Sequence, residues 1–238
     1  MTTYFDAYGE RAATLENHTQ IAGRYAIQHQ AEKHIVQDLI NKLSISSKDT
    51  LLEVGCGTGN LLIPLSFFTK KCVGIDHPGC IKKLSERTKS DNLELLAGDF
   101  LSLKLPREHK FDVIVIYSVL HCLRNSSDVM AFIDKAVALL APGGRLILGD
   151  LPNNDLKQRF VNSQEGQRFS VEWREAIADM PEEPAFEPVS EAVSFDDESV
   201  LSLLLQIRQK GLEAHLLPQP SHLPFGHTRE DIVVRKYC

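Results

Sequence analysis

The sequence predicts an α/β fold with a doubly wound, mostly parallel sheet of seven strands. Short apolar runs alternate with segments of helical periodicity, and the last two runs are joined by a short loop. Alternation of strands and helices is typical of β-α-β units, and strands that are nearly all apolar indicate a sheet covered by helices on both faces. The chain has 238 residues, of which 43% are hydrophobic and 24% charged, as expected for a globular domain.

Residues 1–45 are expected to form an N-terminal arm and a helix, ahead of a main domain at 46–238. Residues 1–19 are polar with scattered aromatic side chains at Tyr4, Phe5 and Tyr8. Apolar residues then recur at helical spacing between about 20 and 43.

Five apolar runs predict the first five strands, at 50–54, 71–76, 93–98, 111–119 and 145–150. A helix is expected to open near Thr58 after the first strand. Pro64 should bend or disturb that helix, because proline cannot donate a hydrogen bond to the carbonyl four residues earlier. Pro78 suits the first turn of the next helix.

The chain is expected to end in a helix at about 197–210 and two strands at 212–218 and 231–237. The loop between these strands is too short for a crossover helix, whereas parallel strands need a crossover of about a dozen residues or more. The last strand is therefore predicted to be antiparallel.

The segment at about 151–197 is predicted to be a helical cap inserted at the carboxyl edge of the sheet. It is too long for an ordinary connection, and residues 153–198 contain twelve acidic and four basic side chains. Arg159, Arg168 and Trp173 either lie on a solvated helix face or close over a substrate, with an arginine meeting an acidic group. The sequence leaves both possibilities open.

A glycine-rich loop follows the first strand. Residues 51–60 read LLEVGCGTGN, with glycines at 55, 57 and 59. Glycine at such a turn allows positive φ angles and lets a ligand approach the backbone, and ligands of doubly wound sheets bind at the carboxyl ends of the strands. The spacing differs from the G-x-G-x-x-G fingerprint of dinucleotide sites, and no Gly-Lys-Ser/Thr of a P-loop follows.

This loop resembles the first motif of class I S-adenosylmethionine-dependent methyltransferases of the small-molecule type. Asp76 at the end of the second strand, GDF at 98–100, FDVIVIYSVLHCL at 111–123 and LLAPGGRLILGD at 139–150 resemble the later motifs in the same order. The resemblance covers about residues 51–150 and leaves out the arm and the cap. It implies a Rossmann-like methyltransferase fold, with S-adenosyl-L-methionine as cofactor and S-adenosyl-L-homocysteine as product.

The resemblance also implies roles for single residues. Asp76 would accept hydrogen bonds from both ribose hydroxyls, although it could instead cap the following helix. Asp99 would accept from the adenine amino group, with Phe100 beside the ring. Glu53, an acid inside an apolar strand, would contact the methionine ammonium or accept from loop amides. The residues expected to bind the cofactor are Glu53, Gly55, Cys56, Gly57, Gly59, Asp76, His77, Asp99, Phe100 and Tyr117.

His121 and Asp150 are the candidate catalytic residues. His121 follows the fourth strand, where the transferred methyl group should point, and histidine can take a proton near neutral pH; it could equally be structural. Asp150 ends the fifth strand and is a candidate base, substrate ligand or helix cap. A sulfonium methyl donor is already activated, so positioning and water exclusion suffice unless the acceptor must lose a proton.

Composition narrows the partners and the compartment. The net charge of −6 offers no basic face for nucleic acid. The N-terminus lacks the pattern of a secretory signal, and no apolar run reaches the ~18 residues of a membrane span. Five cysteines without CxxC spacing indicate a reduced cytoplasmic protein without a metal site. We expect a monomer or homodimer that acts on a small molecule.

The expected activity is methyl transfer to oxygen or nitrogen of a small molecule, such as a secondary metabolite or a sugar. Two alternatives are a non-catalytic module that keeps the cofactor cleft and an NAD-dependent oxidoreductase. The intact glycines and acids disfavour the first, and the glycine spacing and terminal hairpin disfavour the second.

Residues 1–19 and 153–195 are together expected to form a mobile lid over the acceptor, because methyl transfer needs water excluded. The candidates for the inner face of this lid are Phe160, Phe169, Val171 and Trp173.

Overall fold

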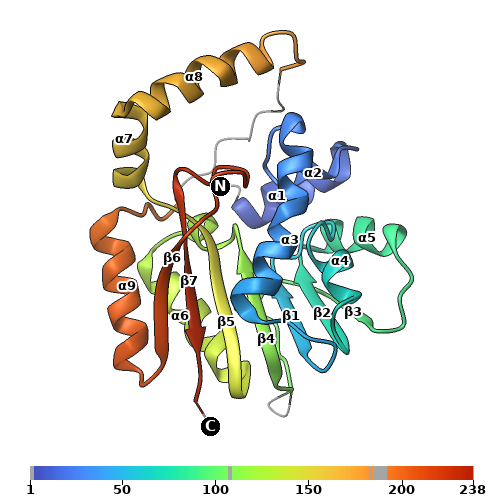
Figure 1. Ribbon diagram of the computed structural model, residues 1–238. Helices are drawn as coiled ribbons and strands as arrows, with labels where there is room; N and C mark the ends of the chain where they lie inside the picture. The colour runs from blue at the N-terminus through green and yellow to red at the C-terminus, as the bar shows by residue number, and fades with distance from the viewer. Residues whose placement is uncertain (1–2, 107–108, 183, 185–191, 238) are drawn as a thin grey trace.

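The computed structural model, which describes residues 3–106, 109–182, 184 and 192–237, has one seven-stranded sheet with helices on both faces (Figure 1). The strand order is β3-β2-β1-β4-β5-β7-β6, which confirms the predicted fold class. The strands are β1 (Thr50–Val54), β2 (Lys71–Asp76), β3 (Leu93–Ala97), β4 (Phe111–Tyr117), β5 (Leu140–Pro152), β6 (Glu213–Pro218) and β7 (Arg229–Arg235).

Strand directions follow the prediction. The pairs within β3-β2-β1-β4-β5 are all parallel, whereas β7 runs antiparallel to both β5 and β6. Since β1 has β2 on one side and β4 on the other, the winding of the sheet reverses between β1 and β4. The carboxyl ends of these two strands therefore form the switch point at which open α/β sheets bind ligands.

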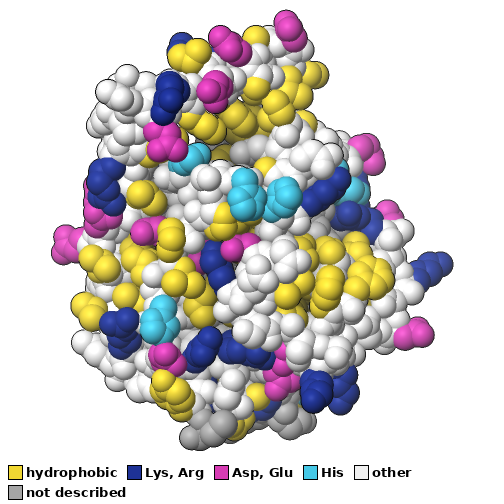
Figure 2. All heavy atoms as spheres, viewed as in Figure 1, with side chains coloured by type: hydrophobic (Ala, Val, Ile, Leu, Met, Phe, Trp, Pro, Cys, Tyr) yellow, Lys and Arg dark blue, Asp and Glu magenta, His cyan; other side chains and the backbone are white. Residues whose placement is uncertain are grey.

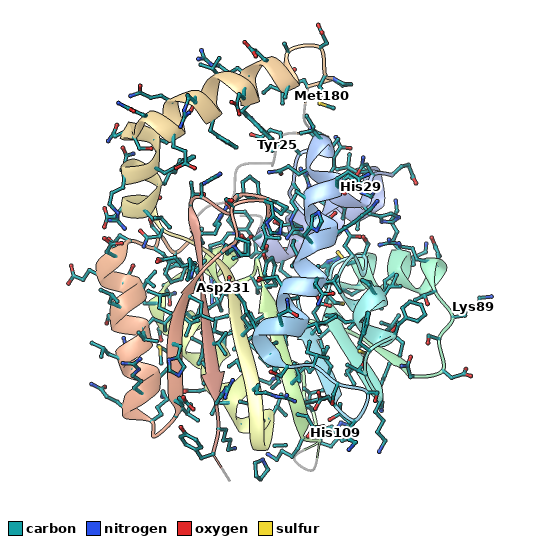
Figure 3. All side chains as sticks on the ribbon, in the orientation of Figure 1. Tyr25, His29, Lys89, His109, Met180 and Asp231 are labelled. Atoms are coloured by element: carbon teal, nitrogen blue, oxygen red, sulfur yellow. The ribbon has the colours of Figure 1, made fainter. Side chains whose placement is uncertain are left out.

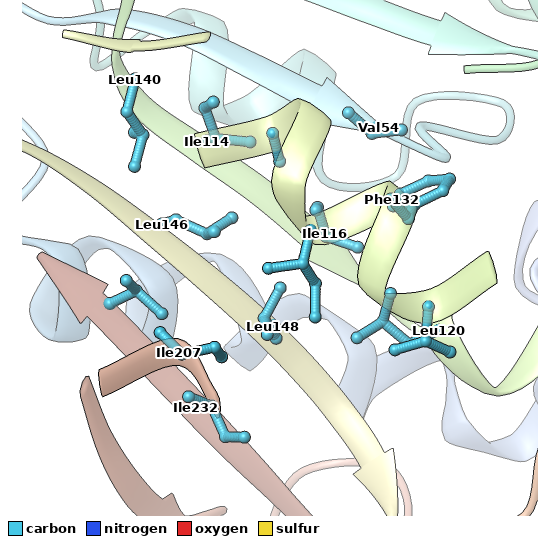
Figure 4. Close-up of a cluster of buried hydrophobic side chains, with 14 of the residues drawn as sticks. Val54, Ile114, Ile116, Leu120, Phe132, Leu140, Leu146, Leu148, Ile207 and Ile232 are labelled. Atoms are coloured by element: carbon cyan, nitrogen blue, oxygen red, sulfur yellow. The ribbon is translucent and has the colours of Figure 1, made fainter. Parts of the chain in front are cut away.

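Alternate strand residues bury the two faces of the sheet. Leu51 and Val113 belong to a cluster with α3, α4 and α5, whereas Leu52 and Ile114 belong to a cluster with α6 and α9. Figure 4 shows part of the second cluster, in which Phe132 of α6 and Ile207 of α9 pack over the strands. The main helices are α3 (His29–Leu43), α4 (Leu62–Ser66), α5 (Pro78–Arg87), α6 (Ser126–Leu139) and α9 (Asp197–Gln209).

The N-terminal arm is helical, and the helix expected from about residue 20 begins later. The arm contains α1 (Tyr4–Thr14), with Thr3 as the N-cap in a capping box, and α2 (His18–Ile21). A turn at Gly23, with a φ of +76°, and the 3-10 helix η1 (Ala26–Gln28) precede α3. The arm packs on α5 through a small cluster of Ala12, Ile21 and Cys80.

The helix after β1 is shorter than predicted. It begins at Leu62 rather than near Thr58, so Pro64 lies in its first turn. An amide in the first turn has no intrahelical partner, and proline is tolerated there. The predicted start was wrong because the glycine loop continues as turns through residue 61.

The cap consists of two helices, α7 (Asn154–Asn162) and α8 (Gln164–Ile177), which leave the carboxyl end of β5 and extend above the sheet (Figure 1). Gly166 is the one buried residue of these two helices. Residues 183 and 185–191 of the predicted insertion, and residues 1–2 of the arm, lie outside the described residues. Within the described ranges, every helix is too short or too polar to cross a bilayer.

Candidate cofactor and acceptor site

A cavity opens at the carboxyl ends of β1, β2 and β4, at the switch point of the sheet. It has an empty volume of about 1030 Å³ including its open mouth. Its walls carry most of the residues that the sequence predicted for the cofactor, namely Glu53, Gly55, Cys56, Gly57, Asp76, Asp99, Phe100 and Tyr117. In the described part of the chain, Gly59, His77, His121 and Asp150 are not among the lining residues.

The glycine loop exposes its backbone to this cavity. Gly55 has a φ of +78°, and a Cβ there would lie 2.3 Å from Val119 Cγ2. At Gly57, with a φ of +53°, no atom lies within 4 Å of a built Cβ. The space beside Gly57 therefore admits a ligand against the backbone. Gly59 has a packing role, because a Cβ there would lie 2.3 Å from Leu84 Cδ1.

Asp76 is held at the cavity wall by two backbone amides. Its Oδ2 accepts from the Gly57 amide at 2.6 Å, and its Oδ1 accepts from the His77 amide at 2.5 Å. Burial raises the pKa of the carboxyl, and these hydrogen bonds oppose the rise. The cap of α5 is His77, whose Nδ1 accepts from the Gly79 amide at 3.0 Å. Asp76 therefore does not serve as the helix cap, which was the alternative for this residue.

Glu53 is a buried acid in the middle of the sheet, at 2% exposure. Its Oε2 has no hydrogen-bond partner among the residues that the structure describes. Burial, with a further contribution from Asp76, raises the pKa of the Glu53 carboxyl to about 8, and Arg24 opposes the rise. The site therefore has an unsatisfied acceptor that a bound ammonium group would complete.

The loop after β3 combines structural and ligand-facing roles. Asp99 lines the cavity, and its Oδ2 also accepts from Ser102 Oγ at 2.7 Å. Phe100, at 3% exposure, packs on Phe132 with ring centroids 4.7 Å apart. Phe100 thus belongs to the core as well as to the cavity wall.

The N-terminal arm forms a wall of the cavity that the sequence did not assign to the cofactor site. Tyr4, Phe5 and Tyr8 of α1 line the cavity, as does Arg24. Arg24 is buried and donates to Glu32 Oε1 at 3.0 Å. The three aromatic residues were visible in a polar segment, but Arg24 gave no signal because the helical pattern there looked continuous.

The two candidate catalytic residues lie one layer behind the cavity wall. Ser118 lines the cavity, accepts from Arg24 at 3.1 Å and donates to Asp150 Oδ2 at 2.5 Å. Both Ser118 and Asp150 have left-handed backbones, with φ of +61° and +59°. Asp231, which pairs with Lys42 at 2.7 Å, accepts from the Asp150 amide at 2.8 Å and holds this conformation.

His121 lies in the 3-10 helix η2 (Leu120–Cys122) after β4. Burial, together with the charges of Arg229 and Arg24, lowers the pKa of His121 to about 4, against the opposing charge of Asp150. The ring is thus neutral at neutral pH and a weaker base than an exposed histidine.

Known proteins resemble the central part of the chain. Residues 52–148 match the sequence model of the methyltransferase domain. Over this range and in its fold, the chain is similar to the class I S-adenosylmethionine-dependent methyltransferases. This family uses S-adenosyl-L-methionine, as the sequence predicted. In the described ranges, no group of His, Cys, Asp or Glu could hold a metal ion.

Three methyltransferases illustrate the similarity. The demethylmenaquinone methyltransferase of Oceanobacillus iheyensis is 29% identical over 128 residues, which are 51% of this chain and 52% of that protein. The malonyl-[acyl-carrier protein] O-methyltransferase of Haemophilus ducreyi is 23% identical over 85% of this chain and 80% of that protein. The solved N-methyltransferase NodS of Bradyrhizobium japonicum, in complex with S-adenosyl-l-homocysteine, has a TM-score of 0.63 at 21% identity and covers 99% of both chains. The chain spans about half the length of the first curated relatives that it matches.

Proposed function

We propose that this chain transfers a methyl group from S-adenosyl-L-methionine to an oxygen or nitrogen atom of a small molecule. The observation that carries the proposal is the cavity at the switch point, where an unsatisfied acid, an open glycine loop and a second acid meet. The proteins with which the chain aligns include an O-methyltransferase and an N-methyltransferase by name, so both acceptor atoms remain in the proposal.

The residues present fit the cofactor. Glu53 would accept from the methionine ammonium, and Arg24 would neutralise the methionine carboxylate. Asp76 would accept from the ribose hydroxyls, and Asp99 with Phe100 would hold the adenine. Bound S-adenosyl-L-methionine supplies a sulfonium-activated methyl group, which needs no further activation by the protein.

The protein's own contribution is to enclose and orient the acceptor. Tyr4, Phe5 and Tyr8 cover one side of the cavity, which keeps water away from the site. Ser118 and Asp150 place hydroxyl and carboxylate oxygens beside the wall, where a proton released by an acceptor hydroxyl can be taken up. The insertion at 153–198, with twelve acidic and four basic side chains, disfavours nucleic acid as the acceptor.

A methyl-transfer assay with isotope-labelled S-adenosyl-L-methionine tests the proposal. Panels of phenols, alcohols, amines and sugars are compared with total RNA and total protein. We expect label in one small-molecule panel, and its loss in the Asp76→Ala variant. Label found only in RNA or protein would overturn the small-molecule assignment. Stoichiometric binding of S-adenosyl-L-homocysteine without any transfer would favour a non-catalytic module.

A further inference from the structure

A cluster of unsatisfied polar side chains lies next to the cofactor cavity. Within the described part of the chain, Asp150 Oδ1, His121 Nδ1 and Arg229 Nη1 are all buried without a hydrogen-bond partner. Arg229 Nε and Asp150 Oδ1 form an ion pair at 3.8 Å, a distance too long for a hydrogen bond. Buried polar atoms without hydrogen bonds cost free energy, so we take these three atoms as the mark of a ligand that supplies the hydrogen bonds.

This cluster adjoins the position where a methyl group would be delivered. Ser118 lines the cofactor cavity and donates to the other carboxylate oxygen of Asp150. Ser118 and Asp150 both have strained left-handed backbones at the ends of adjacent strands. Strain of this kind persists where the surroundings impose it and is concentrated at functional sites.

A series of aromatic rings leads from the cluster to the cap. The Arg229 guanidinium lies 5.1 Å from the centre of the Phe225 ring, which is 6.5 Å from the Tyr25 ring. Tyr25 meets Trp173 of α8 at 5.2 Å, and Trp173 lies parallel to Phe169 at 6.1 Å. The rings come from α8, the segment before η1 and the loop between β6 and β7, and they form a continuous aromatic path.

The aromatic path remains open to a ligand. Tyr25 is 37% exposed and Phe169 is 40% exposed. Tyr25 lies below α8, between the cap and the top of α3 (Figure 3). Hydrophobic side chains gather along the underside of α8 and face the rest of the molecule across a hollow (Figure 2). Three of the four side chains expected on the inner face contact rings outside the cap: Trp173 meets Tyr25 at 5.2 Å, Phe169 meets His227 at 5.2 Å and Phe160 stacks on His227 at 4.3 Å. Val171, the fourth, is 45% exposed.

Arg159, one of the two arginines predicted in the cap, is engaged elsewhere. Arg159 donates to both carboxylate oxygens of Asp197, at 2.5 and 3.0 Å, and so ties α7 to α9. Arg229 on β7 lies over the Phe225 ring of the aromatic path.

The charges beside the aromatic path give no net preference for a charged acceptor. Asp150 and Arg229 have opposite charges, so an acceptor ion of either sign is attracted by one of them and repelled by the other. A neutral hydroxyl satisfies the cluster, because it can donate to Asp150 Oδ1 and accept from Arg229 Nη1. The rings beneath α8 offer aromatic faces rather than the many polar partners that a sugar requires.

We propose that the space between the Asp150–Arg229 cluster and the aromatic path is the acceptor site, and that it takes a neutral phenol. This inference rests on the proposed methyl transfer and specifies its substrate class and acceptor atom. The phenolic oxygen forms a bond to the methyl carbon as the carbon–sulfur bond of the donor breaks. The electron pair of that bond stays on sulfur, which becomes a neutral thioether, and the phenolic proton goes to Asp150 Oδ1.

The single tryptophan of the chain reports directly on this site. Because Trp173 belongs to the aromatic path, a bound aromatic ring should change its fluorescence. The probe is p-cresol, titrated into the full chain saturated with S-adenosyl-L-homocysteine. The matched compounds are 4-methylanisole, which lacks the hydroxyl proton, and cyclohexanol, which lacks the aromatic ring. We expect p-cresol to bind at least tenfold more tightly than either.

Variants separate the two halves of the site. Phe169→Ala and Arg229→Lys should each weaken p-cresol binding about tenfold while leaving the affinity for S-adenosyl-L-homocysteine within twofold. Asp150→Asn should lower the rate of p-cresol methylation at least 100-fold. Phe67→Ala serves as the control, because Phe67 is 81% exposed and far from the site in the fold, after α4. Phe67→Ala should change neither the affinity for p-cresol nor the rate of its methylation.

The outcomes distinguish this inference from the function on which it rests. Methylation of p-cresol on oxygen together with the expected loss in the variants supports both. Methylation of amines, sugars or aliphatic alcohols but not of p-cresol overturns the phenol assignment and leaves the proposed function standing. Equal fluorescence responses to p-cresol in wild type and Phe169→Ala would also overturn it. Failure of every small molecule, with label in RNA or protein, overturns the proposed function.

Discussion

Binding of S-adenosyl-L-homocysteine should be coupled to the ionisation of Glu53. The carboxyl has a pKa of about 8 because it is buried beside Asp76, so it is protonated at pH 6 to 7 when the site holds no ammonium. A ligand ammonium favours the ionised form, so binding releases a proton. The affinity should therefore rise with pH, by up to about tenfold, or 1.36 kcal/mol, for each unit between pH 5.5 and 7.

Titration calorimetry measures this coupling. At pH 6.5, experiments in two buffers of different ionisation enthalpy should show about one proton released for each ligand bound. Glu53→Gln should abolish both the release and the pH slope, and should weaken binding at pH 7. Glu94→Gln is the control, because Glu94 lies on β3, two strands from β1, and its side chain is 38% exposed. It should keep the wild-type slope.

The raised pKa of Glu53 also makes the stability of the ligand-free chain depend on pH. Between pH 4.5 and 8 the folded chain binds a proton at Glu53 that the unfolded chain has lost, so this stabilising contribution falls as pH rises. The contribution of Glu53 to the free energy of unfolding is therefore roughly 3 kcal/mol smaller at pH 7 than at pH 4.5. Denaturation curves of wild type and Glu53→Gln should therefore diverge with rising pH, with the variant gaining relative stability. If the wild-type chain bound S-adenosyl-L-homocysteine with an affinity independent of pH and released no proton, the predicted coupling between binding and Glu53 ionisation would be refuted.

Three further predictions concern the walls of the site. Asp76→Ala should weaken S-adenosyl-L-homocysteine binding in calorimetry, because each lost hydrogen bond to the carboxylate is worth about 1.5–3 kcal/mol; unchanged affinity would show that the ribose does not contact Asp76. Glu32→Gln leaves the Arg24 guanidinium buried without its carboxylate and should cost about 3–5 kcal/mol in urea unfolding, whereas removing Glu94 from its exposed pair with Lys71 should cost less than about 1 kcal/mol; equal losses would argue against the Arg24–Glu32 pair. Hydrogen exchange in α1, α7 and α8 should slow when S-adenosyl-L-homocysteine and p-cresol are both present, and unchanged exchange would contradict a lid made of these segments.

The sequence predicted those parts of the fold that depend on short-range patterns, namely apolar strand runs and motifs at strand ends. Largely apolar runs such as 50–54 and 71–76 were placed with their observed bounds, because burial of both sheet faces leaves little choice of residue. The glycine loop and Asp76 were found for a similar reason, since both occupy fixed positions at strand ends. The start of the helix that contains Pro64 was placed too early. The apolar residues beside Pro64 fit a turn as well as the first residues of a helix, so the sequence pattern did not separate the two.

The acceptor side could not be predicted in the same way. Arg229 and Tyr25 lie far apart in the sequence and meet through Phe225 only in the folded chain. His121 and Asp150 were singled out from their positions after strands, but their burial behind Ser118 depends on two left-handed residues that carry no glycine signal. Arg24 was overlooked because the helical pattern around it looked continuous, whereas the chain turns at Gly23 and α3 begins at His29.

The most direct test of the central claim is a crystal structure of the chain with S-adenosyl-L-homocysteine. The account predicts the ligand at the switch point of the sheet, with its ribose within hydrogen-bond distance of Asp76, its amino group at Glu53 and its adenine beside Phe100. The Gly57 backbone should lie against the ligand, in the space where no protein atom is found. A ligand bound elsewhere, or a cavity that stays empty at saturating concentration, would contradict the account.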